Sequence, residues 1–272
     1  MKFNSLKKGD IVARKSYGMD IAFFIHDIID QDHTPIAILK GVTVRIIADS
    51  PLDDLVILSD TIIKNVLSNF DSELQSSKIC KIKSKIPILK RTYVQYGRIL
   101  HLDGDKKYSE KSQKFYKNIG LNVIVKNVAE KKQPQVITGL LNRYTPDILV
   151  VTGHDGMIKK EHNFNDIYNY RNSRFFVETV IRARMWENRK NKLSIFAGAC
   201  QSYYEALISA GANFASSPAR ILIDFKDPLV VAQKIAMTEE SDFISIKDIE
   251  YDLRDGKDGV NGIGSYGKKI IY

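Results

Sequence analysis

Cys200, one of two cysteines in the 272-residue chain, lies in a setting that suits a nucleophile. It follows the apolar run LSIFA (193–197) and a small-residue turn, and it precedes a segment expected to be helical. Free cysteine is often a buried core residue. The start of a helix, however, stabilises the reactive thiolate and lowers the pKa of the thiol. The context therefore favours a nucleophile with a lowered pKa over a core residue.

His154 is the second candidate for chemistry, because it ends the apolar run ILVVTG between Gly153 and the pair Asp155–Gly156. A lone histidine is more often a packed or surface residue, but a packing role at this position is hard to see. An imidazole beside a thiol accepts its proton and later returns it to the leaving group. His162 is a weaker candidate, since it lies in a polar segment expected to be a loop.

The order of these residues along the chain separates the known classes of nucleophilic hydrolase. All five histidines precede Cys200. Papain-type enzymes place the histidine after the cysteine, and α/β-hydrolases place it after the nucleophile and the acid. A histidine followed 46 positions later by a cysteine matches the spacing of roughly 50 residues in caspases.

From residue 96 onward, apolar runs alternate with amphipathic segments, which predicts an α/β domain with a mostly parallel sheet flanked by helices. The expected strands are 97–103, 121–128, 147–153, 193–198 and 212–218. In open sheets of this kind, functional residues gather at the carboxyl ends of the strands. This rule brings the polar residues after three strands to one rim: His101, Asp103, Asp105, His154, Asp155 and Cys200.

The remaining segments divide the chain into four regions. Short β-rich runs near the start predict a small SH3-like barrel, and the Ser- and Lys-rich stretch after it predicts a helix and a basic linker in which Cys80 is an incidental thiol. The chain should end in a helix with a capping box at 245–248 and a mobile glycine-rich tail. The expected regions are 1–60 (barrel), 61–95 (helix and linker), 96–236 (catalytic domain) and 237–272 (C-terminal helix and tail).

Composition narrows the classes of function. The net charge is +9, but the 41 basic residues are scattered, so we expect a solvated basic surface and no nucleic-acid partner. Two cysteines exclude a disulfide framework, and the absence of a long apolar run predicts a cytoplasmic protein without membrane insertion. The sequence contains no phosphate-binding loop pattern, so it does not favour a flavodoxin-like domain that binds a phosphorylated ligand. His154, Asp155 and His162 lack a recognised metal spacing, so we expect neither metal nor cofactor.

The blocks ILVVTGHDG and LSIFAGACQS resemble the two signature blocks of the caspase-like cysteine peptidases. Longer blocks, among them KKGDIVARKSYGMDI, RILHLDGDKKY and IFAGACQSYYEALISAGANFASSPAR, resemble the YabG family of sporulation-specific proteases of endospore-forming bacteria. The resemblance extends over nearly the whole chain. It implies a caspase-like fold and a cysteine endopeptidase of the mother-cell cytosol or developing spore coat. Such an enzyme would cleave coat and cortex-related proteins after arginine through a thioester acyl-enzyme.

By this resemblance His154 is the general base and Cys200 is the nucleophile. The backbone N–H of Cys200 is one oxyanion donor. The second donor is either Asp155 or Gly156, because an aspartate here stands between the histidine and the glycine that follows it directly in the wider group. Each such donor is commonly worth roughly 100- to 1,000-fold in rate.

An arginine pocket needs a carboxylate that matches the guanidinium fork. Asp103 and Asp105 follow the first strand of the sheet, where similar peptidases carry their pocket acid, and we favour Asp103. Ser216 and Ser217 are weaker candidates for contacts with the substrate backbone, and the basic linker at 90–91 is a candidate self-cleavage site. The alternative function is a non-catalytic basic scaffold or binding module of the spore coat.

Overall fold

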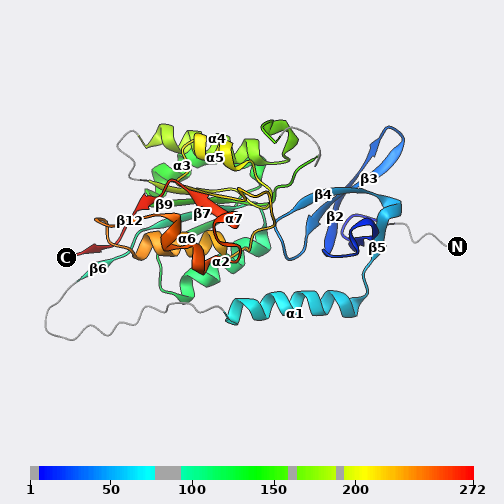
Figure 1. The fold of residues 1–272 in the computed structure, drawn as a ribbon, viewed down its shortest axis with the longest axis horizontal. Coiled ribbons are helices and arrows are strands. Elements are labelled where there is room, and N and C mark those ends of the chain that lie inside the picture. Colours follow the sequence, from blue (N-terminus) through cyan, green and yellow to red (C-terminus); the bar gives the residue numbers. More distant parts are fainter. Residues whose placement is uncertain (1–5, 77–92, 159–163, 188–192) are drawn as a thin grey trace.

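The computed structural model describes residues 6–76, 93–158, 164–187 and 193–272, the side chains of 71–76 excepted. A helix-flanked sheet forms the larger part of the molecule (Figure 1). A smaller sheet from the N-terminal residues lies at one end of it, and helix α1 (Asp60–Ser76) runs along its lower side in this view.

The large sheet has six strands in the order β13-β11-β10-β9-β7-β8, and all pairs are parallel except β11–β13. Its five parallel strands follow the order 2-1-3-4-5 of doubly wound folds, whose switch point lies between the first and third strands. The prediction of a mostly parallel sheet flanked by helices is confirmed. The strands are β7 (Ile99–Asp103), β8 (Val123–Asn127), β9 (Ile148–Thr152), β10 (Ser194–Ala197), β11 (Phe214–Ser216) and β13 (Val260–Gly262).

Helices cover both faces of this sheet (Figure 1). One apolar cluster joins it to α2 (Lys106–Asn118) and α6 (Asp227–Met237). A second cluster on the opposite face joins it to α3 (Gln133–Tyr144), α4 (Ser173–Trp186) and α5 (Tyr204–Ser209). Every residue of β9 is fully buried, which explains why its sequence is continuously apolar instead of alternating.

The N-terminal sheet is antiparallel, with the strand order β4-β3-β2-β1-β5. Among the described strands β4 does not pair with β5, so the sheet stays open and the predicted SH3-like barrel is not confirmed. One face packs in a shared apolar cluster with Cys200 and Ile223 of the α/β region, which therefore covers that face although the sheet is not closed. The strands are β1 (Ile11–Arg14), β2 (Phe23–Gln31), β3 (Thr34–Gly41), β4 (Ile47–Pro51) and β5 (Leu55–Ile57).

The C-terminal region differs from its prediction. The capping box is present at Ser245 and Asp248, but it starts only a single 3-10 turn. The glycine-rich tail, expected to be mobile, contributes α7 (Gly256–Gly259) and the sheet strand β13. A side chain at Gly262 would lie 2.1 Å from the carbonyl oxygen of Asn213, so the glycine permits close strand pairing, not mobility.

Short elements complete the fold. Strand β12 (Phe243–Ile244) pairs with β14 (Ser265–Tyr266), and β6 (Val94–Gln95) pairs with β15 (Ile270–Ile271). The 3-10 turns are η1 (Lys15–Tyr17), η2 (Leu52–Asp54), η3 (Glu130–Lys132), η4 (Ile167–Asn169), η5 (Ile246–Asp248) and η6 (Glu250–Asp252).

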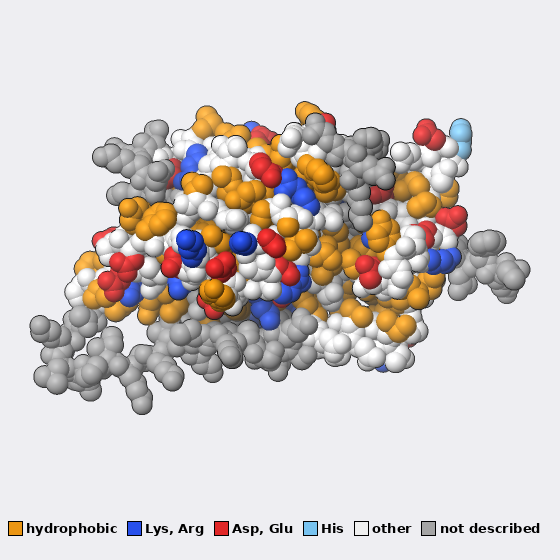
Figure 2. Space-filling model, viewed as in Figure 1, with side chains coloured by type: hydrophobic (Ala, Val, Ile, Leu, Met, Phe, Trp, Pro, Cys, Tyr) orange, Lys and Arg blue, Asp and Glu red, His pale blue; other side chains and the backbone are white. Residues whose placement is uncertain are grey.

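The described helices include none that is long and apolar enough to span a membrane. Basic and acidic side chains are interspersed on the face drawn in Figure 2, where neither sign forms a continuous patch.

Candidate active site

The predicted rim is present at the carboxyl ends of three neighbouring strands. Asp103 ends β7, His154 follows β9 by two residues, and Cys200 follows β10 by three. Because β9 lies between β7 and β10, these residues share one edge of the sheet at its switch point. All three side chains are fully buried, and residues of the N-terminal sheet lie against them.

His154 is held from its backbone, and its ring is left without hydrogen bonds. The Glu130 carboxylate accepts the backbone N–H of His154 at 2.8 Å, and its Oε1 lies 3.8 Å from the ring Nδ1. Neither ring nitrogen has a hydrogen-bond partner among the described residues. Burial lowers the pKa of His154 to about 3, although the charge of Asp105 opposes the shift. The imidazole is therefore neutral at pH 7, the form that can accept a proton.

The thiol of Cys200 differs from its prediction. Burial raises its pKa to about 11, and the backbone of Ile223 and the charge of Arg45 offset only part of this effect. The next helix, α5, has six residues and begins four positions later, so its dipole does not offset the loss of solvent. The expected acidic thiol is therefore wrong for this arrangement, in which the N-terminal sheet excludes water.

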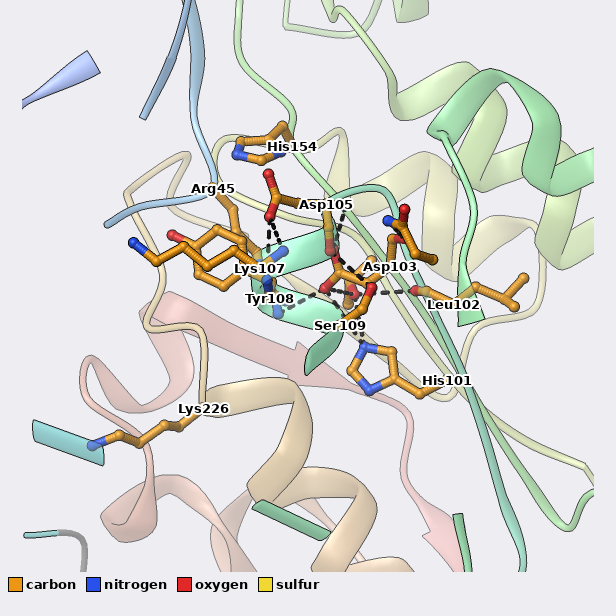
Figure 3. A network of polar contacts seen from close by, with 12 residues as sticks. Arg45, His101, Leu102, Asp103, Asp105, Lys107, Tyr108, Ser109, His154 and Lys226 are labelled. Carbon is orange, nitrogen blue, oxygen red and sulfur yellow. Dashed lines mark hydrogen bonds and ion pairs between the residues drawn. The ribbon is translucent and has the colours of Figure 1, made fainter. Parts of the chain in front are cut away.

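Asp103 binds a guanidinium in this structure. Its Oδ2 lies 2.9 Å from Nη2 of Arg45, a residue of the loop between β3 and β4, and both side chains are fully buried. The guanidinium also lies over the Tyr108 ring, 4.9 Å from the ring centre. Figure 3 shows Arg45 reaching from the N-terminal sheet towards the start of α2. Burial raises the pKa of Asp103 to about 6, against the opposing effect of Arg45.

A short chain of hydrogen bonds orients the Asp103 carboxylate. The Thr152 hydroxyl donates to Oδ2 at 2.9 Å, and the backbone N–H of Asp105 donates to Oδ1 at 2.9 Å. His101 Nε2 lies 2.9 Å from the same hydroxyl, and burial holds the pKa of His101 well below its usual range. A neutral His101 can donate to Thr152 while Thr152 donates to Asp103, so the carboxylate is fixed before any ligand binds.

Asp105 has a different position from Asp103. Its Oδ1 accepts the backbone N–H groups of Lys107 and Tyr108, and it is therefore the N-cap of α2. Figure 3 shows it between the start of that helix and His154. Of the two predicted pocket acids, the structure places only Asp103 on the guanidinium.

Asp155 joins the two loops that carry the histidine and the cysteine. Its carboxylate accepts from the hydroxyls of Ser173 at 2.5 Å and Ser202 at 2.9 Å, and from the backbone N–H groups of Asn172 and Gly156. The backbone N–H of Asp155 is directed away from this cluster, to the carbonyl oxygen of Arg45 at 3.2 Å. The N–H of Gly156 is thus engaged within its own turn.

Ser216 and Ser217 are both buried and bonded within the chain. The hydroxyl of Ser216 donates to the carbonyl of Ala197, and that of Ser217 donates to Ile221. The Ser217 hydroxyl also accepts the backbone N–H of Gln201, next to the cysteine. These contacts shape the Cys200 loop, and their predicted contact with substrate backbone stays a prediction.

Sequence reasoning missed three side chains of this site. Glu130 follows β8, so the strand-end rule that selected Asp103 would also have found it. Tyr108 lies in the first turn of α2 and was treated as part of an ordinary amphipathic helix. Arg45 carries no signal, because nothing in the sequence connects the N-terminal β unit to the rim. The candidates Cys80, His162 and the linker at 90–91 lie outside the described residues.

The chain is similar to known proteins over nearly its whole length. The family model described as YabG peptidase U57 matches residues 7–270. The sporulation-specific protease YabG of Bacillus subtilis (strain 168) is 40% identical over 274 residues, covering 95% of this chain and 94% of that protein. No solved structure matches significantly. The chain is therefore a peptidase that belongs to the YabG peptidase U57 family.

Proposed function

We propose that the chain is a cysteine endopeptidase that cleaves protein substrates after arginine. The observation that carries the proposal is the buried Asp103 carboxylate, which holds a guanidinium on the same rim as His154 and Cys200. Buried ion pairs add little to stability, because desolvation offsets their attraction. A preoriented carboxylate in a closed pocket is better explained by recognition of a substrate cation.

In the proposed reaction the Cys200 thiol attacks the backbone carbonyl carbon of the bound arginine. His154 accepts the thiol proton and delivers it to the leaving amine as the C–N bond breaks, which leaves a thioester on the enzyme. A water molecule, deprotonated by His154, then hydrolyses the thioester and regenerates the thiol. Glu130, 3.8 Å from Nδ1, stabilises the imidazolium that forms in each step.

The oxyanion donors of this mechanism are the backbone N–H groups of Cys200 and Asp155. Asp155 is preferred over Gly156 because its N–H already donates to a carbonyl oxygen from outside the domain. The N–H of Gly156 donates instead to the Asp155 carboxylate at 2.9 Å, a bond that holds the turn in shape.

The substrates we propose are coat and cortex-related proteins of a sporulating cell, and the site of action is the mother-cell cytosol or the developing coat. This part rests on the similarity to the sporulation-specific protease of Bacillus subtilis. The region 96–236 is the proposed catalytic domain. The competing function, a non-catalytic coat scaffold, does not require a preoriented Asp103.

The test is hydrolysis of fluorogenic peptides with arginine, lysine or citrulline before the scissile bond. The proposal expects thiol-dependent cleavage of the arginine peptide, weaker cleavage of lysine and almost none of citrulline. Cys200→Ala and His154→Ala should each abolish turnover, while both variants keep the wild-type melting temperature to within a few degrees. Turnover that persists in Cys200→Ala, or no turnover of peptides and coat protein by any form, would reject the cysteine mechanism.

A further inference from the structure

The loop between β3 and β4 (residues 42–46) lies in the active site in the manner of a substrate. Arg45 places its guanidinium on Asp103, and its carbonyl oxygen accepts the N–H of Asp155, the proposed oxyanion donor. Ile46, the next residue of this loop, lies in the same apolar cluster as Cys200. The pair Arg45–Ile46 therefore lies against the specificity acid, the oxyanion donor and the nucleophile together.

The residues after Arg45 run along the catalytic domain as a short strand. Ile46 forms a parallel bridge with Asp155, and the N–H of Ile47 donates to the Asp155 carbonyl at 2.8 Å. A side chain at Gly156 would approach the Ile47 carbonyl oxygen to 2.1 Å, so this glycine admits the passing backbone. Further along, Asp49 forms an ion pair with Arg171. The chain is thus held on both sides of the Arg45–Ile46 bond.

The environment of Arg45 is that of a bound ligand. Beyond the Asp103 carboxylate and the Tyr108 ring, its guanidinium nitrogens have no hydrogen-bond partner among the described residues. A structural arginine buried this deeply would be expected to use more of its five donors. The single contact with a separately oriented carboxylate fits a pocket built to exchange its occupant.

We infer that Arg45–Ile46 is a self-cleavage site, and that the β3–β4 loop blocks the arginine pocket until this bond is cut. The inference rests on the proposed function. In the cut, the Cys200 sulfur bonds to the Arg45 carbonyl carbon and the bond to the Ile46 nitrogen breaks. His154 transfers the thiol proton to the new amine, and water then releases the Arg45 carboxylate. Because β4 stays paired with β3, the two fragments remain associated while Arg45 becomes free to leave the pocket.

The first test follows the purified full-length protein by intact mass and N-terminal sequencing. We expect fragments 1–45 and 46–272 that co-elute in gel filtration, with a rate constant unchanged on tenfold dilution because the bond is already bound within its own chain. The Cys200→Ala protein should stay whole. A wild-type protein that cleaves arginine peptides while Arg45–Ile46 stays intact overturns the inference and leaves the proposed function standing. A rate proportional to protein concentration also overturns it.

The second test uses Arg45→Ala, with Lys8→Ala as a control that removes the same charge from an exposed position in the turn before β1. Arg45→Ala should stay uncut and should cleave an arginine peptide without the lag of the wild type, whereas Lys8→Ala should match the wild type. In a Cys200→Ala background, Arg45→Ala should bind benzamidine at least tenfold more tightly than the Lys8→Ala protein. Equal benzamidine binding would show that Arg45 does not fill the pocket. If Arg45→Ala does not fold, the first test decides.

Discussion

Replacement of Asp103 by asparagine tests the arginine pocket directly. Asparagine keeps the shape of the side chain and removes its charge, so a bound guanidinium would be buried without a counter-ion. Removal of one partner of a buried ion pair costs about 3–5 kcal/mol. Since each 1.36 kcal/mol is tenfold in rate, kcat/KM for arginine peptides should fall by about 100-fold to a few thousand-fold. This cost for a buried pair applies here because the Arg45–Asp103 contact of 2.9 Å joins two fully buried side chains.

The assay compares kcat/KM for arginine and citrulline peptides. Any effect of the substitution on His154 and Cys200 acts on both peptides and cancels in the ratio of the two values. To avoid the cost of the internal Arg45 contact, Asp103→Asn is best measured in the Arg45→Ala background, with melting temperature as the folding control. Asp105→Asn is the matched control: asparagine caps helices about as well as aspartate, so its ratio should change no more than a few-fold. An Asp103→Asn ratio within threefold of its parent would refute the pocket assignment.

The ratio of kcat/KM for arginine peptides to kcat/KM for citrulline peptides should also depend on pH. Burial raises the pKa of Asp103 to about 6, and only the ionised carboxylate attracts a guanidinium. Discrimination for arginine over citrulline should therefore be complete above pH 7 and should decline as the pH falls through about 6. In Asp103→Asn the ratio should be low at every pH, so a ratio that still rises with pH in this variant would point to another acid.

Two further changes probe positions outside the pocket. Glu130→Gln should lower kcat at least tenfold with little change in KM. The reason is that a charge 3.8 Å from Nδ1 of His154 is worth a few kcal/mol at an effective dielectric constant of about 20. An unchanged kcat–pH profile would contradict this positioning role. Burial, aided by the charge of Asp224, raises the pKa of Asp227 from 3.8 to about 7, so its contribution to stability is lost as pH rises from 4 to 7. Between pH 5 and 8 the wild type should therefore lose about 2–3 kcal/mol of unfolding free energy relative to Asp227→Asn. Urea denaturation at both pH values measures this difference, and parallel curves for the two proteins would exclude it.

The sequence was sufficient to predict the sheet and its rim. Continuous apolar runs such as that of β9 predict strands buried on both faces, and the strand-end rule then brings Asp103, His154 and Cys200 to one edge. These inferences succeed because they depend on local patterns and on one general property of parallel sheets. From the sequence, Asp103 was only preferred over Asp105 as the pocket acid. Both follow the same strand, and spacing does not distinguish a carboxylate that caps a helix from one that binds a substrate cation.

Predictions that depend on what covers a surface did not succeed. The N-terminal strands were expected to close into a barrel, but the α/β region covers their open face. The glycine-rich tail was expected to be mobile, but Gly262 lets β13 approach β11 closely. The pKa of the Cys200 thiol was expected to be low, yet burial raises it to about 11. In each case a distant segment decides the outcome.

The chain order of histidine and cysteine, the α/β pattern and the resemblance to a peptidase family were thus determined by the sequence alone. Only the tertiary structure decided that Arg45, from a separate β unit, occupies the site, and that Asp103 is the carboxylate it contacts. The physical reason is that pairing across a domain boundary depends on the shape and charge of two folded surfaces. Neither surface exists until each part of the chain has folded.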